Sequence, residues 1–500
     1  MKKQKRVVST LLLAAIIASL LVSTSCGQTV ENDDGITSSN QDSTTDTGIV
    51  ENDPVDKRSS VTDDLPEKKF GGYGFTVLTD TGLDWTIIQP EETGDVIDDS
   101  IYRRNITVED RFGIKLNVLM EDPGNLGSKI TSSVQAGDDD IDLVCGHVVF
   151  LGSLALEDMF LNWYDIPYID FSKPWWSKST TDDLSVNDVC PLAISDFALS
   201  ALANTYCVFY NKRLAENYGI TDLYDIVNEG KWTIDKVLSL TKDIYTDLDA
   251  DNTANGADLY GFISTARSSL NTYLWSFGGH VLEKDANGDV SLVYHSPKTN
   301  DFIEKLCSFY FDNQGIYINS KEPEYSSFFA LEKFTNNEAV FINGAIGNSV
   351  EYLRSMEDDY GIIPYPKWDE AQDGYHTMVD GSHDILGVPK TASDTERTGI
   401  IVEALSAESY KKVVPAYYET ALKTKYTRDD ESIAMIDMIV NSRVFDLGYV
   451  YDAWNGASFI FQTLISANKP IFESYWASNE KKITTYYNDK VIAFFENYDK

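Results

Sequence analysis

The stretch GFTVLTD, Gly74–Asp80, opens the part of the chain that carries a regular folding pattern. It is short and rich in β-branched and apolar residues, which predicts a buried strand. The stretch DDSIYRRNITVEDRFGI, Asp98–Ile114, then has apolar residues at helical spacing, and KLNVLM (Lys115–Met120) and IDLVCG (Ile141–Gly146) are strand-like. Strands that alternate with helices predict βαβ units and a parallel sheet, so the expected fold class is α/β.

The ends of these strands indicate where a ligand would bind. In open α/β sheets, ligands bind beyond the carboxyl ends of the strands. Those ends are Asp80–Trp85 and Gly146–His147. We therefore expect the binding site to include residues from these turns.

The same alternation continues through the middle of the chain. The run TYCVFYNKRLAENYGI (Thr205–Ile220) predicts a buried strand that enters a helix, and KWTIDKVLSLTKDIYTD (Lys231–Asp247) predicts an amphipathic helix. AVFING (Ala339–Gly344) and YGIIPYP (Tyr360–Pro366) predict two further strands, each followed by turn residues.

Helices dominate the last part of the chain. The pattern after Ser393 is helical, and Glu396 three residues later makes Ser393 the expected N-cap. Pro415 interrupts this pattern, and a second helix is expected to continue with Pro415 near its first turn.

The N-terminus has the layout of a secretory signal peptide. Lys2 to Arg6 form a basic start, an apolar run follows from Val7 to Val22, and small residues precede Cys26. We expect residues 1–25 to be the signal peptide. The segment resembles the lipobox of bacterial lipoproteins, although Ser23 occupies a position where that motif usually has Leu. This resemblance implies a lipid on Cys26 and a tether at the outer membrane face, and the alternative is an ordinary signal peptide.

A polar tract follows the signal peptide. Residues 26–67 are rich in Ser, Thr, Asp, Asn and Gly and include TSSNQDSTTDTG. Such a segment buries too little apolar surface to offset its chain entropy. We expect a disordered acidic linker that holds the folded part away from the membrane.

Charge and cysteine content argue against nucleic-acid binding, zinc binding and redox chemistry. The net charge of −38 disfavours nucleic acid and anionic ligands, so no nucleic-acid partner is expected. Cys145, Cys190, Cys207 and Cys307 have no CxxC spacing, which argues against zinc and redox pairs. A disulfide between Cys190 and Cys207 stays open.

Several stretches, in this order, resemble the bacterial extracellular solute-binding proteins of ABC importers, in the carbohydrate-associated group related to maltose-binding protein. They are EETGDVIDDSIYRRNITVEDRFGIKL, IDLVCG, FYNKRLAENYGI with GKWTIDKV, NNEAVFINGAIG, YGIIPYPKWD and LGVPKTASDTERTGIIVEAL. The resemblance spans most of the chain and rests on the collinear set of stretches.

This resemblance implies a two-lobed periplasmic-binding-protein-like fold of type II, with a hinge and C-terminal helices. Segments that cross between the lobes are expected near Ala203 and near Asp380–Pro389. The implied layout is residues 68–200 with 376–425 for lobe 1 and residues 205–372 with 430–500 for lobe 2.

A sugar ligand would require aromatic rings for its C–H faces and polar groups for its hydroxyls. Tryptophans near strand ends or loops are candidate rings, although each is as well explained by packing in the core. Asp380 is the leading polar candidate because it begins the segment expected to recross the hinge. The candidate ligand-binding residues are Asp80, Asp84, Trp85, Trp175, Trp176, Trp275, Asp380, Ser382, Trp454 and Asn455.

One further motif lies outside the expected cleft. TDLDADNTANGADLYGF has oxygen-bearing residues at the spacing of an EF-hand-type loop, which predicts a structural calcium ion. Asn252 replaces the usual Gly, and the last ligand is an Asp instead of the longer Glu. A solvated acidic loop is the alternative. The candidate ligands are Asp247, Asp249, Asp251, Thr253, Asn255 and Asp258.

The resemblance implies a monomeric binding protein, not an enzyme, which captures an oligosaccharide by hinge closure and delivers it to membrane permease subunits. No cofactor is required apart from the predicted calcium. The main alternative is a secreted glycoside hydrolase with a carboxylate pair, which an acidic sequence allows. No GxSxG, P-loop or HExxH motif indicates another chemistry. A peptide or polyamine ligand also stays open.

Overall fold

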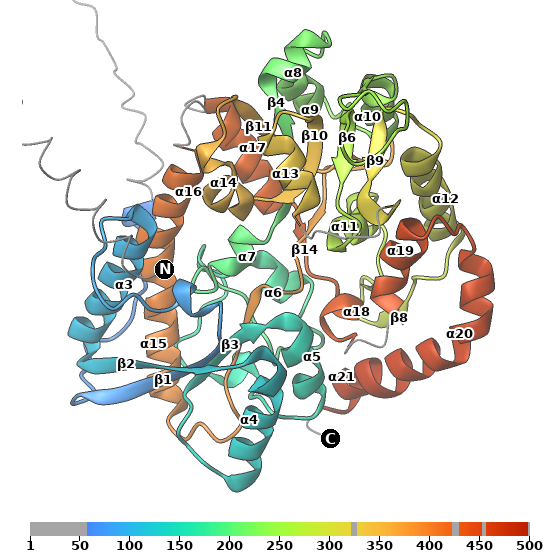
Figure 1. The fold of residues 1–500 in the computed structure, drawn as a ribbon. Helices are drawn as coiled ribbons and strands as arrows, with labels where there is room; N and C mark the ends of the chain where they lie inside the picture. The colour runs from blue at the N-terminus through green and yellow to red at the C-terminus, as the bar shows by residue number, and fades with distance from the viewer. Residues whose placement is uncertain (1–57, 322–327, 423–429, 453–456, 499–500) are drawn as a thin grey trace, which may run out of the picture. The chain divides into compact units, whose positions relative to one another are not determined.

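The computed structural model describes residues 58–321, 328–422, 430–452 and 457–498. The predicted signal peptide, Cys26, most of the predicted linker, Trp454 and Asn455 lie outside the described residues. The described strands form two large sheets and two short strand pairs (Figure 1).

The first sheet contains the strands predicted from the start of the folded region. Its order is β13-β3-β1-β2, with β1 (Tyr73–Asp80), β2 (Ile114–Glu121), β3 (Leu143–His147) and β13 (Asp384–Gly387). β1 runs parallel to β2 and β3, whereas β13 is antiparallel to β3. Phe75 and Val77 pack into one core and Leu78 into another, because successive strand residues face opposite sides of the sheet.

The helix α3 (Val96–Phe112) connects β1 to β2, as the helical spacing predicts. The Asp95 side chain caps it by accepting a hydrogen bond from the backbone N–H of Ile97. Gly113 ends it with a φ of 60°, the left-handed conformation that glycine adopts without strain. The connection from β2 to β3 is α4 (Pro123–Ala136), and α5 (Val148–Leu156) follows β3.

A long helical segment packs beside α3 (Figure 1). It consists of α15 (Thr395–Glu408), the π-helical stretch η5 (Ser409–Val413) and α16 (Val414–Leu422). The N-cap prediction was wrong by one residue: the Asp394 side chain accepts from the Arg397 N–H, whereas Ser393 bonds to Asp139. Pro415 lies in the first turn of α16, as expected, and η5 joins the two helices without a loop.

The second sheet has the order β11-β4-β10-β6-β5, and β9 pairs with β6. β6, β9 and β10 are parallel to one another, whereas β4 runs antiparallel to β10. The strands are β4 (Tyr206–Asn211), β5 (Tyr245–Thr246), β6 (Leu259–Ser264), β9 (Ile316–Ile318), β10 (Ala339–Ala345) and β11 (Tyr360–Ile363).

Many helices surround this sheet and continue to the C-terminus (Figure 1). α13 packs on β10 and α17 on β11, while α11 packs on α19. They are α8 (Lys212–Asn217), α9 (Leu223–Asn228), α10 (Ile234–Thr241), α11 (Ser268–Ser276), α12 (Pro297–Phe311), α13 (Phe329–Thr335), α14 (Gly347–Glu351), α17 (Asp430–Asn441), α18 (Leu447–Val450), α19 (Ala457–Ser466), α20 (Phe472–Tyr486) and α21 (Ala493–Asn497).

Three segments that lie between the two sheets pair with one another. The first contains α7 (Ser200–Ala203) and leads into β4, and the second contains β12 (Thr377–Met378) and leads into β13. They run antiparallel, with a bridge between Thr205 and Val379 and a hydrogen bond of 2.9 Å from the Asp380 N–H to the Asn204 carbonyl. The third contains β14 (Arg443–Val444), which pairs with β12. We call these three the crossing segments.

Residues 58–67 belong to the folded part and not to the linker that the composition predicts. Asp63 accepts a hydrogen bond of 3.0 Å from Arg111, and Asp64 pairs with Lys173 at 2.6 Å. Val61 and Leu65 pack against the core of the first sheet. These ion pairs and apolar contacts offset the loss of chain entropy on folding. The composition of the segment does not reveal them because they involve distant residues.

The cysteines left open by the sequence are free thiols. Cys190 lies in the core of the first sheet, and Cys207 lies in a core of the second sheet. Burial raises the pKa of the Cys190 thiol to about 12, so this group stays protonated.

Close packing of α5 against α18 generates a prediction. A Cβ added at Gly152 would lie 1.9 Å from the backbone oxygen of Val450. Backbone cannot move aside as a flexible side chain can, so Gly152→Ala should destabilise the fold by about 1–3 kcal/mol. The matched control is Gly127→Ala in α4, whose added Cβ would lie 3.8 Å from Leu154. Urea unfolding of both variants checks this, and equal midpoints would contradict it.

Candidate functional site

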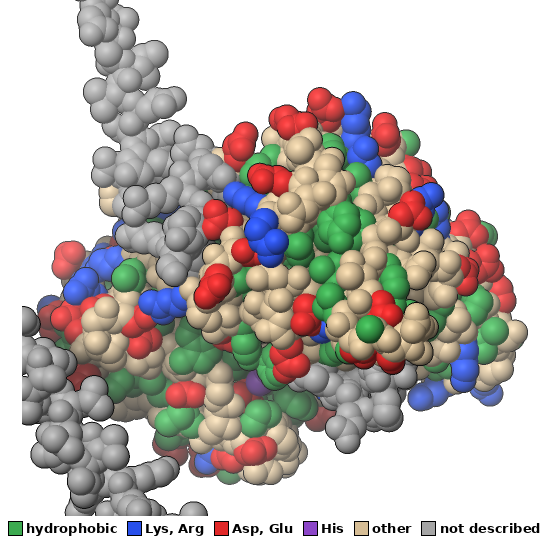
Figure 2. All heavy atoms as spheres, turned by 45° about the horizontal axis from the view of Figure 1, so that its top comes forward, with side chains coloured by type: hydrophobic (Ala, Val, Ile, Leu, Met, Phe, Trp, Pro, Cys, Tyr) green, Lys and Arg blue, Asp and Glu red, His purple; other side chains and the backbone are tan. Residues whose placement is uncertain are grey.

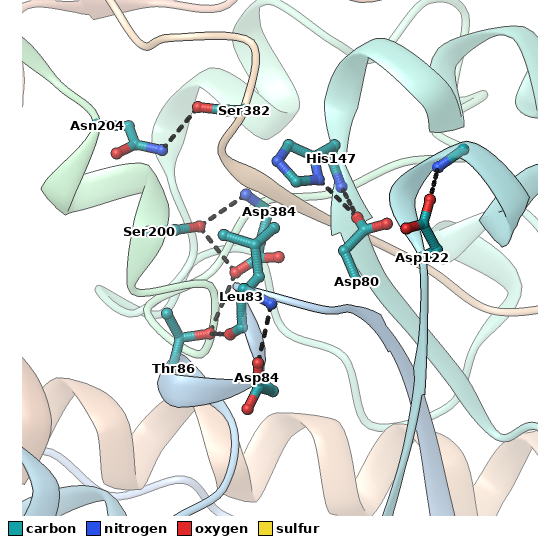
Figure 3. Close-up of polar contacts among 12 residues, drawn as sticks. Asp80, Leu83, Asp84, Thr86, Asp122, His147, Ser200, Asn204, Ser382 and Asp384 are labelled. Carbon is teal, nitrogen blue, oxygen red and sulfur yellow. Dashed lines mark hydrogen bonds and ion pairs between the residues drawn. The ribbon is translucent and has the colours of Figure 1, made fainter. Parts of the chain in front are cut away.

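A polar group lies where β1 and β3 end. Asp80 is fully buried, and its Oδ2 accepts hydrogen bonds of 2.8 Å from both the backbone N–H and the Nδ1 of His147 (Figure 3). The Asp80 Oδ1 has no hydrogen-bond partner among the described residues. This carboxylate is therefore held in place, and its second oxygen is buried without a hydrogen-bond partner among the described residues.

A second buried carboxylate stands at the start of β13. Asp384 Oδ2 accepts from Ser200 at 2.8 Å and from Thr86 at 3.2 Å (Figure 3). Burial raises the pKa of Asp384 to about 6, although both hydroxyl bonds oppose this rise. Asp384 pairs with His147 across the strands, so both carboxylates lie at one edge of the first sheet.

The crossing segments extend this polar region to the second sheet. The Tyr206 hydroxyl, at the start of β4, donates to Asp380 Oδ2 at 2.8 Å. Asp380 Oδ1 accepts from the Ser382 hydroxyl at 2.7 Å, and the Asn204 amide donates to that hydroxyl at 3.3 Å. β6, β9 and β10 all end at the edge where β4 begins. The carboxyl edges of both sheets thus meet at the crossing segments.

We name these residues the hinge-edge cluster. All except Asp80 are half-buried, so they are partly open to solvent. The cluster consists of Asp80, His147, Asn204, Tyr206, Asp380 and Ser382.

Two further predicted site residues lie in the turn after β1. Asp84 is half-buried, and its Oδ1 accepts a hydrogen bond of 3.0 Å from the Gly82 N–H (Figure 3). Trp85 is also half-buried and packs against a core cluster that includes Ile97 and Ile101. Part of this indole therefore stays exposed at the same sheet edge as Asp80.

The other described tryptophans on the candidate list lie in the core. The indole N–H groups of Trp175 and Trp176 both donate to Glu403 at 2.8 Å, and these side chains are 0% and 4% exposed. Trp275 is 1% exposed, and its indole donates to Asp446 at 3.0 Å. We assign these three residues to packing, because their faces contact the core and their only polar group is already bonded.

Exposed aromatic rings occur beside the second sheet. They are not among the tryptophans that the sequence analysis names as candidate sugar-binding rings. Phe328 and Tyr352 are 43% and 37% exposed, and their ring centroids lie 5.0 Å apart. Phe328 precedes α13, and Tyr352 follows α14, which begins after β10. They provide apolar surface near the carboxyl edge of this sheet.

The predicted calcium loop joins β5 to β6. The expected incoming helix ends at Thr241, so strands flank the loop on both sides. Carboxylate oxygens of Asp247, Asp249 and Asp258 lie within 4.8 Å of one another. Asn252 has a φ of 60°, which is the left-handed backbone that the usual Gly adopts. Calcium binding by these residues with Asp251, Thr253 and Asn255 stays a prediction.

A family model described as bacterial extracellular solute-binding protein matches residues 107–429. The chain belongs to this family. Because solute-binding proteins of this family are extracellular, we place the chain outside the cytoplasm. A search of curated proteins found no match.

Solved structures share the fold of this solute-binding protein. The galacto-N-biose-/lacto-N-biose I-binding protein of the ABC transporter from Bifidobacterium longum has 12% identity and a TM-score of 0.56, with 85% of this chain and 98% of that chain covered. An ABC substrate-binding protein from Listeria monocytogenes, in complex with cycloalternan, has 12% identity and a TM-score of 0.54, with 83% and 98% covered. This similarity confirms the predicted two-lobed α/β fold, and we call the first and second sheets with their helices lobe 1 and lobe 2.

A solute-binding protein from Thermotoga lettingae, bound with α-D-tagatose, gives the same result. It has 13% identity and a TM-score of 0.51, and 82% of this chain and 100% of that chain are covered.

In the part of the chain that the structure describes, no helix is long and apolar enough to span a membrane.

Sequence analysis missed several residues of the hinge-edge cluster. It placed His147 in a turn expected to border the site but did not name it as a candidate ligand-binding residue, and it overlooked Asn204 and Tyr206. Only their position in the chain could have indicated a role in the site. Asn204 and Tyr206 flank the start of a predicted buried strand, and this start lies beside an expected crossing segment. The hydrogen bonds that join Tyr206 to Asp380 and Asn204 to Ser382 form only after distant segments of the chain pair. The sequence does not show this pairing.

The Glu403 contact predicts a pH effect. Burial raises the pKa of Glu403 to about 7, despite the lowering effect of both indole bonds. Because the folded-state pKa is above the unfolded value, the stability that protonated Glu403 contributes is lost as pH rises through about 7. Tryptophan emission should titrate in the same range, and Glu403→Gln should abolish this titration. Glu396→Gln, in the same helix but with a half-buried side chain paired with Lys68, should leave it unchanged.

The acidic loop predicts a response to calcium. Added Ca²⁺ should raise the thermal unfolding midpoint because it binds only the folded loop, and a chelator should reverse the rise. Asp249→Asn should remove most of this rise, whereas Asp243→Asn, an equal charge change outside the candidate ligands, should retain it. A rise of equal size in both variants would exclude the loop as the site.

Proposed function

We propose that this chain is the capture component of an ABC importer for a carbohydrate, with an oligosaccharide as the expected solute. The observation that carries this proposal is the fold similarity to sugar-bound proteins, which covers 98% of the proteins that hold lacto-N-biose and cycloalternan. Family membership supplies the solute-binding role, and these complexes favour sugar as its chemical class.

The hinge-edge cluster has the chemistry that a sugar requires. Sugar hydroxyls both donate and accept, and Asp80 offers a buried acceptor oxygen without a partner among the described residues. Asn204 and Ser382 offer further polar groups, and they are only half-buried. We propose that Asp80, Asp84, Asp380 and Ser382, with His147 and Asn204, bind the hydroxyls.

Aromatic rings can complete the site from both lobes. Half-buried Trp85 lies at the edge of lobe 1, and the exposed pair Phe328 and Tyr352 lies on lobe 2. Sugar C–H faces stack on such rings while the hydroxyls point to polar groups. Trp454 and Asn455 stay candidates from the sequence, since they lie outside the described residues.

The crossing segments provide the mechanism. Rotation about them would change the separation between the sheet edges while the hydrogen bond from Asp380 to Asn204 keeps the segments paired. A ligand that contacts both edges stabilises the closed state by the difference between its affinities for the two states. The closed form would then be recognised by permease subunits, and the protein would act as a monomer.

Catalysis is the alternative that the acidic sequence left open. Glycosidases need two carboxylates across the scissile bond, and Asp80 and Asp384 are two carboxylates at one edge. Both carboxylates, however, are fully buried, and Asp384 is also bonded to Ser200 and Thr86, so neither is placed as an exposed acid or nucleophile. We therefore favour binding, and peptide or polyamine solutes are weaker alternatives because the fold similarity points to sugars.

The N-terminal sequence supports the proposed location. A signal peptide over residues 1–25 and a lipid on Cys26 would anchor an extracellular binding protein to the membrane surface. The acidic tract after Cys26 would then separate the lobes from the membrane. We also propose that the acidic loop between β5 and β6 is a structural calcium site, separate from solute capture.

Thermal unfolding of the purified chain against mono- and oligosaccharides tests the function. A sugar at about 100 times its Kd should stabilise the folded state by about 2.7 kcal/mol and raise the midpoint. Trp85→Ala should weaken binding of that sugar about tenfold or more, because the stacking contact with the half-buried indole is lost. Tyr218→Ala, which removes an exposed ring that follows α8, should retain full affinity.

The same experiment also shows which results would contradict the proposed carbohydrate-binding function. Chromatography of the sugar after incubation should recover it unchanged, and cleavage would favour a glycosidase. If no sugar raises the midpoint while a peptide or polyamine does, the carbohydrate assignment is wrong and the capture role stands.

A further inference from the structure

A polar cavity lies apart from the hinge-edge cluster. Its volume is about 890 Å³, and none of the six cluster residues lines it. Its walls come from the loop around residues 171–181, from α16 and α17, and from two crossing segments through Leu202 and Arg443. The cavity therefore lies at the hinge and has its own set of side chains.

Two opposite charges face this cavity without pairing. Asp196 is half-buried, and among the described residues its carboxylate has neither a hydrogen bond nor an ion pair. Arg443 is also half-buried, and its Nε donates to the Val440 carbonyl at 2.9 Å. Its terminal guanidinium nitrogens make no hydrogen bond within the described part of the chain, and no ion pair joins Arg443 to Asp196.

Leaving these groups unpaired has a free-energy cost. Burial raises the pKa of Asp196 to about 7, and Arg58 and Arg443 oppose this rise only at a distance. A ligand with a cation would compensate Asp196, and a ligand with an anion would compensate Arg443. A neutral sugar would leave both charges without a counter-charge.

Aromatic side chains supply the rest of the wall. Phe171 and Trp176 contact each other edge to face, with ring centroids 5.1 Å apart. The Arg58 guanidinium, which also lines the cavity, lies 4.5 Å from the ring centroid of Tyr410 and 5.8 Å from that of Tyr418. An apolar body could pack against Phe171, Tyr410 and Tyr418 while its charged ends reach Asp196 and Arg443.

We propose that this cavity binds a small zwitterion with an apolar body, such as an aromatic amino acid or a short peptide. The ammonium group lies against Asp196, and the carboxylate accepts hydrogen bonds from the Arg443 guanidinium. Guanidinium groups suit carboxylates because they present parallel N–H donors. A divalent cation fits less well, since two arginines line the same space.

Calorimetry with L-phenylalanine tests the proposal on the purified chain. Phenylalanine should bind at millimolar concentration or below, and two analogues should bind at least about tenfold more weakly. These analogues are phenethylamine, which lacks the carboxylate, and 3-phenylpropionate, which lacks the ammonium group. Equal binding of either analogue would overturn the zwitterion assignment.

Variants assign the binding to the cavity. Asp196→Asn keeps the side-chain shape and should weaken phenylalanine at least about tenfold, and Arg443→Gln should do the same. Lys178→Gln, at an exposed lining residue paired with Asp182, should retain the affinity. Circular dichroism checks that each variant is folded.

Two outcomes would overturn the proposal without affecting the proposed sugar site. The first is no phenylalanine binding at millimolar concentration, or binding that Asp196→Asn leaves unchanged. The second is loss of phenylalanine binding in Trp85→Ala, because this would place the amino acid at the sugar cleft. Sugar binding by the same preparation reports separately on the proposed function.

Discussion

Pairing of the crossing segments is the constraint on which the rest of the structure depends. The bridge between Thr205 and Val379 and the hydrogen bond from Asp380 to Asn204 hold two passes of the chain side by side. Because one pass leads into β4 and the other into β13, this contact fixes where the two sheets meet. The hinge-edge cluster forms there since polar side chains beside the paired backbone are brought together from distant parts of the sequence.

Buried carboxylates organise the packing around this centre. Glu403 accepts from two indoles in the core of lobe 1, and Asp446 accepts from the Trp275 indole and from the backbone N–H groups of Val281 and Gly448. Each carboxylate satisfies several donors that burial would otherwise leave unpaired. The acidic composition therefore has structural uses inside the protein besides the Asp and Glu side chains spread over the surface in Figure 2.

Local pattern allowed much of the fold to be predicted. Alternating strand and helix signals gave the parallel sheet of lobe 1, because each pattern reflects the spacing of residues within one element. Boundaries were less accurate: Asp394 and not Ser393 caps α15, and residues 58–67 are folded although their composition favours a linker. In both cases a contact with a distant residue, Asp139 for Ser393 and Arg111 for Asp63, decided the outcome.

The sequence by itself determined the class of fold, the family resemblance, the turns that end β1 and β3, and the spacing of the acidic loop. Only the tertiary structure decided which side chains remain available to a ligand. Trp175, Trp176 and Trp275 have the residue type that binds sugars, yet their indoles bond to carboxylates far away in the sequence. Asn204 and Tyr206 carry no motif, yet they join the hinge-edge cluster. Residue type is local, whereas burial and pairing depend on which distant segments pack together.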